Sequence, residues 1–222
     1  MEPQILFEDD SIIVLNKPAG MIVYPDQVHD YPALSDWLQK KYGEFHIVHR
    51  IDRETSGVLV VAKTAEAYKF LKNQFKNREV QKTYRAFVYG PLKDERGAID
   101  KPIGSGRGGR GPRSARRPHG VERDALTLWR RISNSSKARG DGVCYVEVFP
   151  KTGRTHQIRV HFAAIQHPVV ADQLYAPTRA RVLGFERLAL HALSIAFVHP
   201  NGRQLKFDAP LPADFIAAEK LL

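Results

Sequence analysis

A short apolar run near the first quarter of the chain constrains the fold more than any other feature. Residues 57–62 read Gly-Val-Leu-Val-Val-Ala, with three valines in six positions. A β-branched run of this kind favours a strand that is buried on both faces. The polar segment directly before it would then lie at the mouth of a core strand. We therefore expect the chain to build a sheet around residues 57–62.

The rest of the chain mixes strand and helix signals without a regular βαβα order. Alternation and turn residues predict further strands at residues 11–16, 83–89, 125–132, 144–149, 188–198 and 204–207. Helices are expected at residues 33–42, 64–77, 155–166 and from residue 212, with Thr64 and Thr155 as N-caps. This order predicts an α+β fold with a mainly antiparallel sheet, and we see no internal repeat.

Size and composition indicate an ordinary globular protein with a strong positive charge. The 222 residues suit a single domain over 1–222, and no apolar run reaches the ~18 residues that cross a bilayer. The start of the chain lacks the pattern of a secretion signal, so we expect a cytoplasmic location and no membrane. The net charge is +10 and the pI is near 9.8. This excess favours a polyanionic partner such as nucleic acid, although a basic but otherwise ordinary enzyme would also fit.

Residues 104–118 form a segment rich in glycine and arginine. The segment holds five arginines, no acidic residue and no large apolar residue. We expect it to be a flexible exposed loop that adds nothing to a core. It could close over RNA phosphates or remain a solvated loop. Its Gly-x-Gly-x-x-Gly pattern over 104–109 does not indicate a dinucleotide site, because Gly111-Pro112 follows where a helix should begin.

Metal and hydrolase signals are weak. The chain has nine histidines but one cysteine, Cys144, which excludes an internal disulfide and a cysteine-based zinc site. The pairs His46/His49 and His156/His161 lack metal-binding spacing, so we predict no metal and no cofactor. The chain also contains no G-x-S-x-G motif and no phosphate-binding P-loop.

Two polar clusters could carry chemistry. The first covers residues 48–57 and contains Asp52 between Arg50 and Arg53. A fixed, ionised carboxylate could act as nucleophile or base, or it could simply cap a turn. The second covers residues 151–161, where a glycine turn leads into a predicted helix start with many donors. There Arg159 follows a core-facing isoleucine, and a half-buried arginine needs an anion such as Asp52. The same segment could instead be a basic helix on the surface.

Together these clusters resemble the RluA-type pseudouridine synthases. The hallmark His-Arg-Ile-Asp followed by Thr-Ser-Gly spans residues 49–57 here. Four further blocks agree in order, and the resemblance covers about residues 5–215. These blocks are Asn16-Lys17-Pro18-Ala19-Gly20, Lys82-Thr83-Tyr84-Arg85-Ala86, the stretch 152–161, and Arg187-Leu188-Ala189-Leu190-His191-Ala192 with His199-Pro200.

The resemblance implies the pseudouridine synthase fold, a long mixed sheet with flanking helices and a central active-site cleft. It implies that Asp52 is the nucleophile, that Tyr84 stacks on the target uracil and helps to move its proton, and that Arg159 pairs with Asp52. Arg50 would fill the space left by the flipped nucleotide. The further substrate-binding candidates are His49, Thr55, Lys82, Lys151, Arg154, Ile158, Arg107 and Arg110.

The implied activity is the isomerisation of specific uridines in structured RNA to pseudouridine. The substrate would be a uridine in a loop or stem-loop of ribosomal or transfer RNA, and we expect a monomer. The small RNA-binding module that many relatives carry before this block is not expected here, because Ile5-Leu6-Phe7 already begins the block. Two other classes remain open at this point. One is a non-catalytic RNA-binding protein with this fold, and the other is a nuclease that uses the basic cleft.

Overall fold

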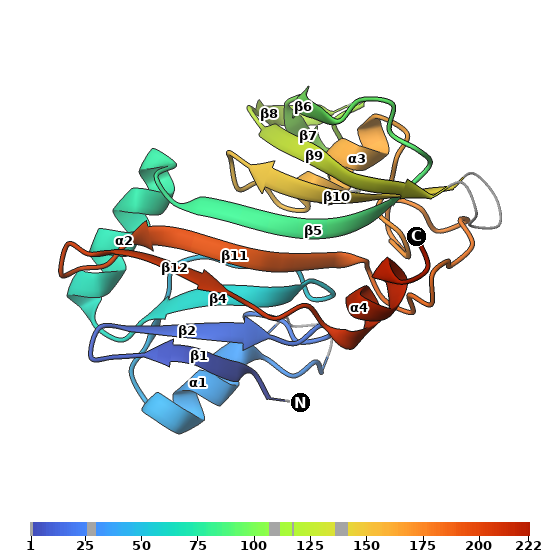
Figure 1. Cartoon of the computed structure of the whole chain (residues 1–222). Coiled ribbons are helices and arrows are strands. Elements are labelled where there is room, and N and C mark those ends of the chain that lie inside the picture. The colour runs from blue at the N-terminus through green and yellow to red at the C-terminus, as the bar shows by residue number, and fades with distance from the viewer. Residues whose placement is uncertain (1, 26–29, 107–111, 117, 136–141) are drawn as a thin grey trace. The chain divides into compact units, whose positions relative to one another are not determined.

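A computed structural model describes residues 2–25, 30–106, 112–116, 118–135 and 142–222 (Figure 1). The contacts divide the chain into two compact units, which we describe separately. The first unit comprises Met1–Lys82 and His191–Leu211, and the second comprises Thr83–Leu190 and Pro212–Leu222. The expectation of a single domain over residues 1–222 stays a prediction.

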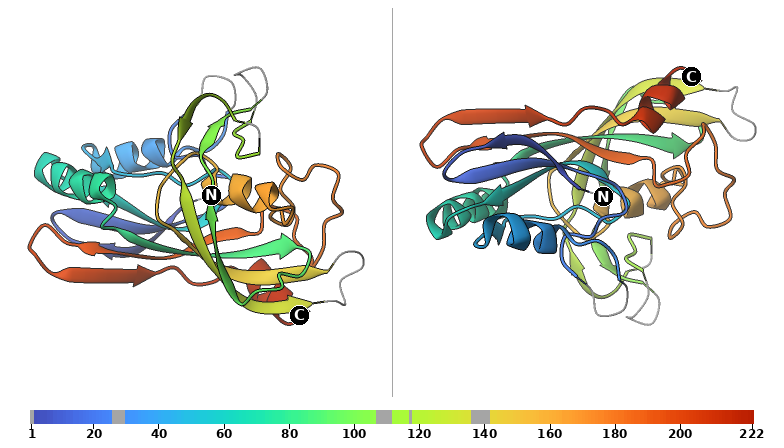
Figure 2. Two further views of the ribbon diagram at one scale, coloured as in Figure 1. Left: turned by 90° about the horizontal axis from the view of Figure 1, so that it is seen from above. Right: turned by 90° about the horizontal axis from the view of Figure 1, so that it is seen from below.

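The first unit is a mixed sheet with two helices. Its strand order is β1-β2-β4-β11, and outside this order β12 pairs with β11 and a short strand, β3, pairs with β4. Only the β4–β11 pair is parallel among these described pairings. Both views in Figure 2 show the two helices of this unit on the same face of the sheet. The elements are β1 (Gln4–Glu8), β2 (Ile12–Lys17), α1 (Leu34–Tyr42), β3 (His46–Ile47), β4 (Ser56–Ala62), α2 (Ala65–Asn77), β11 (Leu190–Val198) and β12 (Gln204–Asp208).

The predicted core strand is confirmed, because β4 is buried at every position. Gly57 begins the buried run with φ +115°, a conformation that side chains rarely adopt. A Cβ atom at this position would lie 2.1 Å from the carbonyl oxygen of Ala192 in the parallel neighbour β11. Glycine therefore allows β4 and β11 to approach closely at the end that follows the Asp52 segment.

The predicted N-cap of α2 is also confirmed. The hydroxyl of Thr64 accepts a hydrogen bond of 3.2 Å from the backbone N–H of Ala67. Ala67 and Leu71 are buried along the inner stripe of the helix. Gln74 is buried on the same helix, and its amide both donates to and accepts from the backbone of Val198 in β11. These bonds tie α2 to the sheet.

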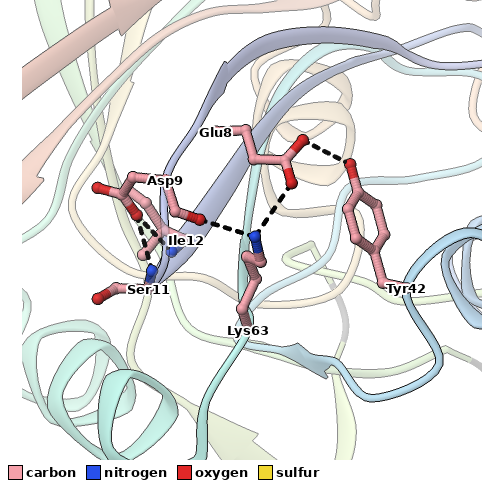
Figure 3. Close-up of polar contacts among 6 residues, drawn as sticks. All are labelled: Glu8, Asp9, Ser11, Ile12, Tyr42 and Lys63. Atoms are coloured by element: carbon pink, nitrogen blue, oxygen red, sulfur yellow. Dashed lines mark hydrogen bonds and ion pairs between the residues drawn. The ribbon is translucent and has the colours of Figure 1, made fainter.

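A polar cluster joins β1, α1 and the end of β4 (Figure 3). The ammonium of Lys63 lies 3.0 Å from Glu8 Oε1 and donates to the carbonyl of Asp9 at 2.8 Å. The phenol of Tyr42 donates to Glu8 Oε2 at 2.8 Å. These hydrogen bonds lower the pKa of Glu8, while burial and the bond to Glu8 raise the pKa of Tyr42 to about 12. The cluster thus holds the C-terminal end of α1 against the strands.

The second unit is an antiparallel sheet with a separate two-stranded ribbon and two helices. The strand order is β5-β10-β9-β6, and β7 pairs with β8 in the ribbon. The views in Figures 1 and 2 place α3 and α4 on opposite faces of the sheet. The elements are β5 (Gln81–Tyr89), β6 (Arg96–Asp100), β7 (Ile103–Ser105), β8 (His119–Arg123), β9 (Leu126–Ser135), β10 (Val143–Pro150), α3 (Gln157–Ala164) and α4 (Ala213–Glu219).

Side-chain contacts define the two faces of this sheet. On one face the ring of Phe87 stacks on that of Tyr145, with the ring centroids 4.3 Å apart. The same ring packs against Phe215 of α4, with centroids 5.5 Å apart. On the other face the hydroxyl of Thr127 in β9 lies 2.9 Å from Nδ1 of His161 in α3. Helix α3 therefore covers the face opposite α4.

The predicted cap of α3 was wrong. The helix begins at Gln157 after His156, whose φ of 56° and ψ of 22° are left-handed, rather than after Thr155. A left-handed residue cannot continue a right-handed helix, so the chain enters α3 one residue later than a Thr155 cap would give. The helix ends at Ala164 instead of Gln166.

The expectation for residues 104–118 was wrong for part of the segment that the structure describes. Gly104 belongs to β7 and exchanges two backbone hydrogen bonds with Ser114. Ala115 is buried in a small core cluster with Ile103, Ala125 and Val160. A backbone pairing and one small apolar side chain were thus enough to anchor a segment without large apolar residues.

The α+β class with a mainly antiparallel sheet is confirmed. The short or irregular strands β1, β3, β6, β7 and β8 were not predicted, since none has a clear alternation of apolar and polar residues. No helix in the described part of the chain is long and apolar enough to cross a membrane.

Candidate active site

Asp52 lies in a short turn whose backbone is anchored on both sides. Ile51 before it is buried, and the carbonyl of Asp52 itself accepts from the N–H of Thr55 at 3.1 Å. The carbonyl of Arg53 accepts from the N–H of Gly20 at 2.8 Å. The Asp52 residue is half-buried. The turn therefore presents a carboxylate from a backbone that is held by residues far away in sequence.

Lys17 is the second anchor of this turn. Its side chain is fully buried at the end of β2, and its ammonium donates to three carbonyls. These carbonyls belong to Pro18 at 2.7 Å, Met21 at 2.8 Å and Arg53 at 3.1 Å. Burial of an ammonium is costly unless its donors are satisfied. Lys17 was noted in the sequence only as part of a motif, because nothing local indicates that this lysine is buried.

The residues around Asp52 differ in exposure. Arg50 is exposed, whereas Thr55 is 1% exposed. Ser56 follows with its hydroxyl 2.9 Å from Nδ1 of His191, in a fully buried pair between β4 and β11. Among the described residues, the hydroxyl of Thr55 has no hydrogen-bond partner. Substrate contacts by Arg50 and Thr55 stay predictions.

His49 serves as a structural contact within the first unit. Its Nε2 accepts a hydrogen bond of 3.0 Å from the backbone N–H of Val60. Its ring stacks on that of Phe75, with the ring centroids 4.6 Å apart. Burial, together with the charges of Lys82 and Lys72, lowers the pKa of His49 to about 3. The ring is therefore neutral near pH 7, and because Nε2 accepts, its proton is on Nδ1.

Lys82 lies at the start of β5 and is half-buried. Burial lowers the pKa of its ammonium to about 8. A fraction of this lysine is therefore uncharged at a slightly alkaline pH. Its predicted contact with RNA stays a prediction.

Tyr84 projects from the face of its sheet that α3 covers. It pairs in register with Val148 of β10, and Val148 pairs with Trp129 of β9. Directly paired residues in an antiparallel sheet share a face, and so do residues two apart in one strand. Thr127 lies two residues from Trp129, and Thr127 contacts α3 through His161. Tyr84 and α3 are consequently on the same side of this sheet.

Arg159 is buried in α3 and is held by a carboxylate of its own unit. Its Nε and Nη2 donate to the two oxygens of Asp172, each at 2.8 Å. Arg159 is 8% exposed and Asp172 is 1% exposed. This bidentate geometry is the strongest form of an arginine–carboxylate pair.

The sequence alone assigned no role to Asp172, the carboxylate that the structure pairs with Arg159. A half-buried Arg159 was predicted to need an anion, and Asp52 was the example that the sequence suggested. Asp172 also accepts from the N–H groups of Leu174 and Tyr175, so four hydrogen bonds satisfy its carboxylate. The sequence signal that could have indicated Asp172 is the short polar stretch after the apolar pair Val169-Val170. The pairing of Arg159 with Asp52 stays a prediction.

A buried chain of hydrogen bonds supports the turn before α3. The carbonyl of Lys101 must receive the proton of His161 Nε2 at 3.0 Å, so His161 Nδ1 accepts from the hydroxyl of Thr127. Thr127 in turn accepts from the amide of Gln157 at 3.0 Å. The oxygen of that amide accepts from Thr152 at 2.6 Å. Burial lowers the pKa of His161, which keeps the ring neutral as this pattern requires.

The remaining candidates lie around this turn. Lys151 is exposed, and Arg154 is half-buried with its Nε donating to the carbonyl of Asp124 at 3.0 Å. Ile158 is buried. Arg107 and Arg110 lie outside the described residues. In the described ranges, no group of three or more His, Cys, Asp or Glu side chains could hold a metal ion.

Comparisons with known proteins agree with this architecture. The family model described as RNA pseudouridylate synthase matches residues 11–164. A dual-specificity RNA pseudouridine synthase RluA from Vibrio parahaemolyticus is 36% identical over 95% of this chain and 83% of its own length. A ribosomal large subunit pseudouridine synthase D from Zymomonas mobilis is 36% identical over 99% of this chain and 72% of its own.

Solved structures show the same fold. Human RNA pseudouridylate synthase domain containing 1 superimposes with a TM-score of 0.81 at 28% identity, covering 95% of this chain and 84% of its own. Human RNA pseudouridylate synthase domain containing 4 gives a TM-score of 0.77 at 25% identity, covering 98% of this chain and 92% of its own. The family match includes the segments that carry Asp52, Tyr84 and Arg159. This chain therefore belongs to the RNA pseudouridylate synthase family.

Proposed function

We propose that Asp52 is the nucleophilic carboxylate of this RNA pseudouridine synthase, an isomerase that converts uridine in RNA to pseudouridine. The observation that supports this role most is the anchoring of its turn by Lys17 and Gly20, which both donate to the carbonyl of Arg53. A nucleophile must be held close to its productive geometry, and a turn fixed at the mouth of a buried strand meets that need.

The reaction conserves all atoms and electrons. The bond between uracil N1 and ribose C1′ breaks, the base turns, and a bond between C5 and C1′ forms. The proton on C5 leaves and N1 gains one, so no oxidant or reductant is consumed. Asp52 would attack C1′, attack the uracil ring, or remove a ribose proton.

The target base must leave its helical stack before it can react. Base flipping costs a few kcal/mol. In our proposal Arg50 fills the space that the base leaves, which its exposed position supports. Tyr84 stacks on the flipped uracil and takes part in the proton transfer from C5. Its place on the α3 side of β5 supports a shared role with Arg159.

Basic side chains around the α3 turn would bind the RNA backbone. Lys151 and Arg154 flank Gly153 and precede α3, and with Arg107 and Arg110 they would contact phosphates without reading sequence. His49, Thr55, Lys82 and Ile158 are the other residues that we propose for substrate binding. The proposed substrate is a uridine in a loop or stem-loop of ribosomal or transfer RNA, acted on by a monomer in the cytoplasm.

The test replaces Asp52 by asparagine. Asp52→Asn should bind RNA as the parent does and form no pseudouridine, measured by nucleoside analysis after incubation with total RNA from cells that lack this enzyme. Glu54→Gln is the matched control, because Glu54 lies two residues away and pairs with Arg53 at 2.8 Å. The control should keep its activity. Normal turnover by Asp52→Asn would refute the assignment.

A further inference from the structure

We propose that His156 and Tyr175 are positioning residues that hold the guanidinium of Arg159 in one orientation for the isomerisation. The inference rests on the proposed function for the importance of Arg159. It goes beyond that proposal because neither His156 nor Tyr175 was assigned any role. The four residues His156, Tyr175, Arg159 and Asp172 form a continuous network within the second unit.

Asp172 links Arg159 to Tyr175. The same oxygen, Oδ1, accepts from Nη2 of Arg159 at 2.8 Å and from the backbone N–H of Tyr175 at 3.0 Å. The ring of Tyr175 then lies with its centroid 5.2 Å from Cζ of Arg159, within the range of a cation–π contact. The carboxylate of Asp172 thus orients the plane of the guanidinium. It also fixes the backbone of Tyr175, whose ring covers that plane.

His156 fixes the other end of Tyr175. Its Nδ1 lies 3.1 Å from the phenol oxygen, and the two rings meet edge to face with centroids 5.8 Å apart. Tyr175 is half-buried and packs against the apolar cluster of Ile103, Ala115, Ala125 and Val160, and the bond to His156 fixes its phenol end. The histidine therefore restricts the ring, and the ring restricts the guanidinium.

The backbone of His156 indicates that this contact is maintained at a cost. Its φ of 56° and ψ of 22° lie in the left-handed region, which costs a non-glycine residue about 1–2 kcal/mol. His156 is the residue from which α3 starts, three positions before Arg159. Strain of this kind is commonly found at functional sites and is maintained by the surrounding structure. The Gln157–Thr152 hydrogen bond is part of that support here.

The N–H groups of the Arg159 guanidinium consequently point in defined directions. Asp172 engages two of the five N–H groups that a guanidinium carries. Since the group is planar, fixing these two fixes the directions of the other three. A shift of about 1 Å at a reacting centre can reduce the rate a hundredfold. The Tyr175 ring is the second contact that holds this plane, so loosening it should slow turnover more than it weakens RNA binding.

The test uses two variants that preserve the local backbone. Tyr175→Phe keeps the ring over Arg159 and loses the bond to His156. His156→Asn removes the imidazole and inserts a residue that tolerates the left-handed conformation. Both should lower kcat between about tenfold and a hundredfold while the Kd for RNA stays within about twofold of the parent. Tyr175→Phe loses one hydrogen bond, about 0.5–1.5 kcal/mol, and His156→Asn offsets that loss by relieving the left-handed strain, so both should stay folded in the assay.

Gln166→Asn is the matched control for backbone strain. Gln166 is exposed at the other end of the same helix, with a φ of 69°. It should gain a small stability from the relieved left-handed strain and keep its kcat. Parental kcat in His156→Asn and Tyr175→Phe would overturn the inference. A fall in kcat that matches the fraction of unfolded protein in the assay would overturn the inference as well, since it would show a purely structural role.

A double variant and a spectroscopic readout separate this inference from the proposed function. If His156 acts through Arg159, His156→Asn should add no further loss in kcat to Arg159→Lys. Independently of activity, the Nε–H of Arg159 should exchange slowly with solvent in the parent, as measured by NMR, and faster in both single variants. Unchanged exchange would refute the positioning role. An active Asp52→Asn with accelerated exchange in His156→Asn would refute the nucleophile assignment alone.

Discussion

The guanidinium of Arg159 holds the carboxylate of Asp172 through two hydrogen bonds of 2.8 Å, and both side chains are buried. The two residues are thirteen positions apart, one on α3 and one in the loop that follows it. The pair satisfies a charge that would otherwise be isolated in the interior of the second unit. It also connects the helix to the loop that carries Tyr175.

Removing either partner of this pair should therefore strongly destabilise the fold. Asp172→Ala leaves a buried arginine without its carboxylate, and we expect a loss of about 3–5 kcal/mol in the free energy of unfolding. Urea denaturation would measure it. Asp214→Ala is the control, because Asp214 pairs with the partly exposed Arg187 at 2.7 Å and should cost about 1 kcal/mol or less. Equal losses in the two variants would contradict the importance of burial.

Lys17 gives a second stability prediction. Lys17→Met removes the donor for three carbonyls, including that of Arg53 beside Asp52, and should cost about 2–4 kcal/mol. It should also raise the rate of proteolytic cleavage near Asp52. Lys63→Met removes a lysine whose side chain is 26% exposed and should cost about 1 kcal/mol. Unchanged cleavage near Asp52 in Lys17→Met would argue against an anchoring role.

His49 predicts a dependence of stability on acid. Its pKa is about 3 in the folded state and near 6.5 in the unfolded chain, so between these values the unfolded state binds more protons. Its contribution to stability is complete above pH 6.5 and is lost as the pH falls toward 3. The buried His161 acts in the same direction. His49→Gln should flatten the fall in urea midpoint between about pH 7 and about pH 5. An unchanged slope would show that His49 is not the titrating group.

Tyr42 predicts the opposite behaviour in alkali. Its pKa rises from 10.0 to about 12 on folding, so the folded state retains the phenol proton over this range. The stability from Tyr42 is present below pH 10 and is lost as the pH rises toward 12. Tyr42→Phe should remove this part of the alkaline loss, measured by denaturation beside the phenolate absorbance. Glu8, whose pKa is lowered, loses its contribution as the pH falls below 4.5.

Gly57 should tolerate no side chain. Gly57→Ala combines positive φ with a Cβ that would lie 2.1 Å from the carbonyl oxygen of Ala192, and we expect a loss of about 3 kcal/mol or more. Gly43→Ala is the control. Gly43 has φ +74° but no atom within 4 Å of an added Cβ, so its cost should be about 1–2 kcal/mol. Similar losses would show that the β4–β11 distance can adjust.

Local signals in the sequence predicted local structure well. The valine-rich run became the buried strand β4, and Thr64 caps α2 as expected. These features depend on neighbouring residues, because periodicity and capping act over a few positions. The same reasoning failed at Thr155, because the next residue, His156, has a left-handed backbone and its side chain contacts a tyrosine 19 residues away. The motif order across the chain, together with the family comparison, was sufficient to place the chain among the RNA pseudouridylate synthases.

By itself the sequence determined the fold class, the family and which residues are candidates for the chemistry. Only the tertiary structure decided that Asp172 holds Arg159, that Lys17 anchors the Asp52 turn and that His49 is neutral. The physical reason is that hydrophobic periodicity is contained in consecutive residues. The partner of a buried charge, and the pKa that results, depend on which distant groups are desolvated together.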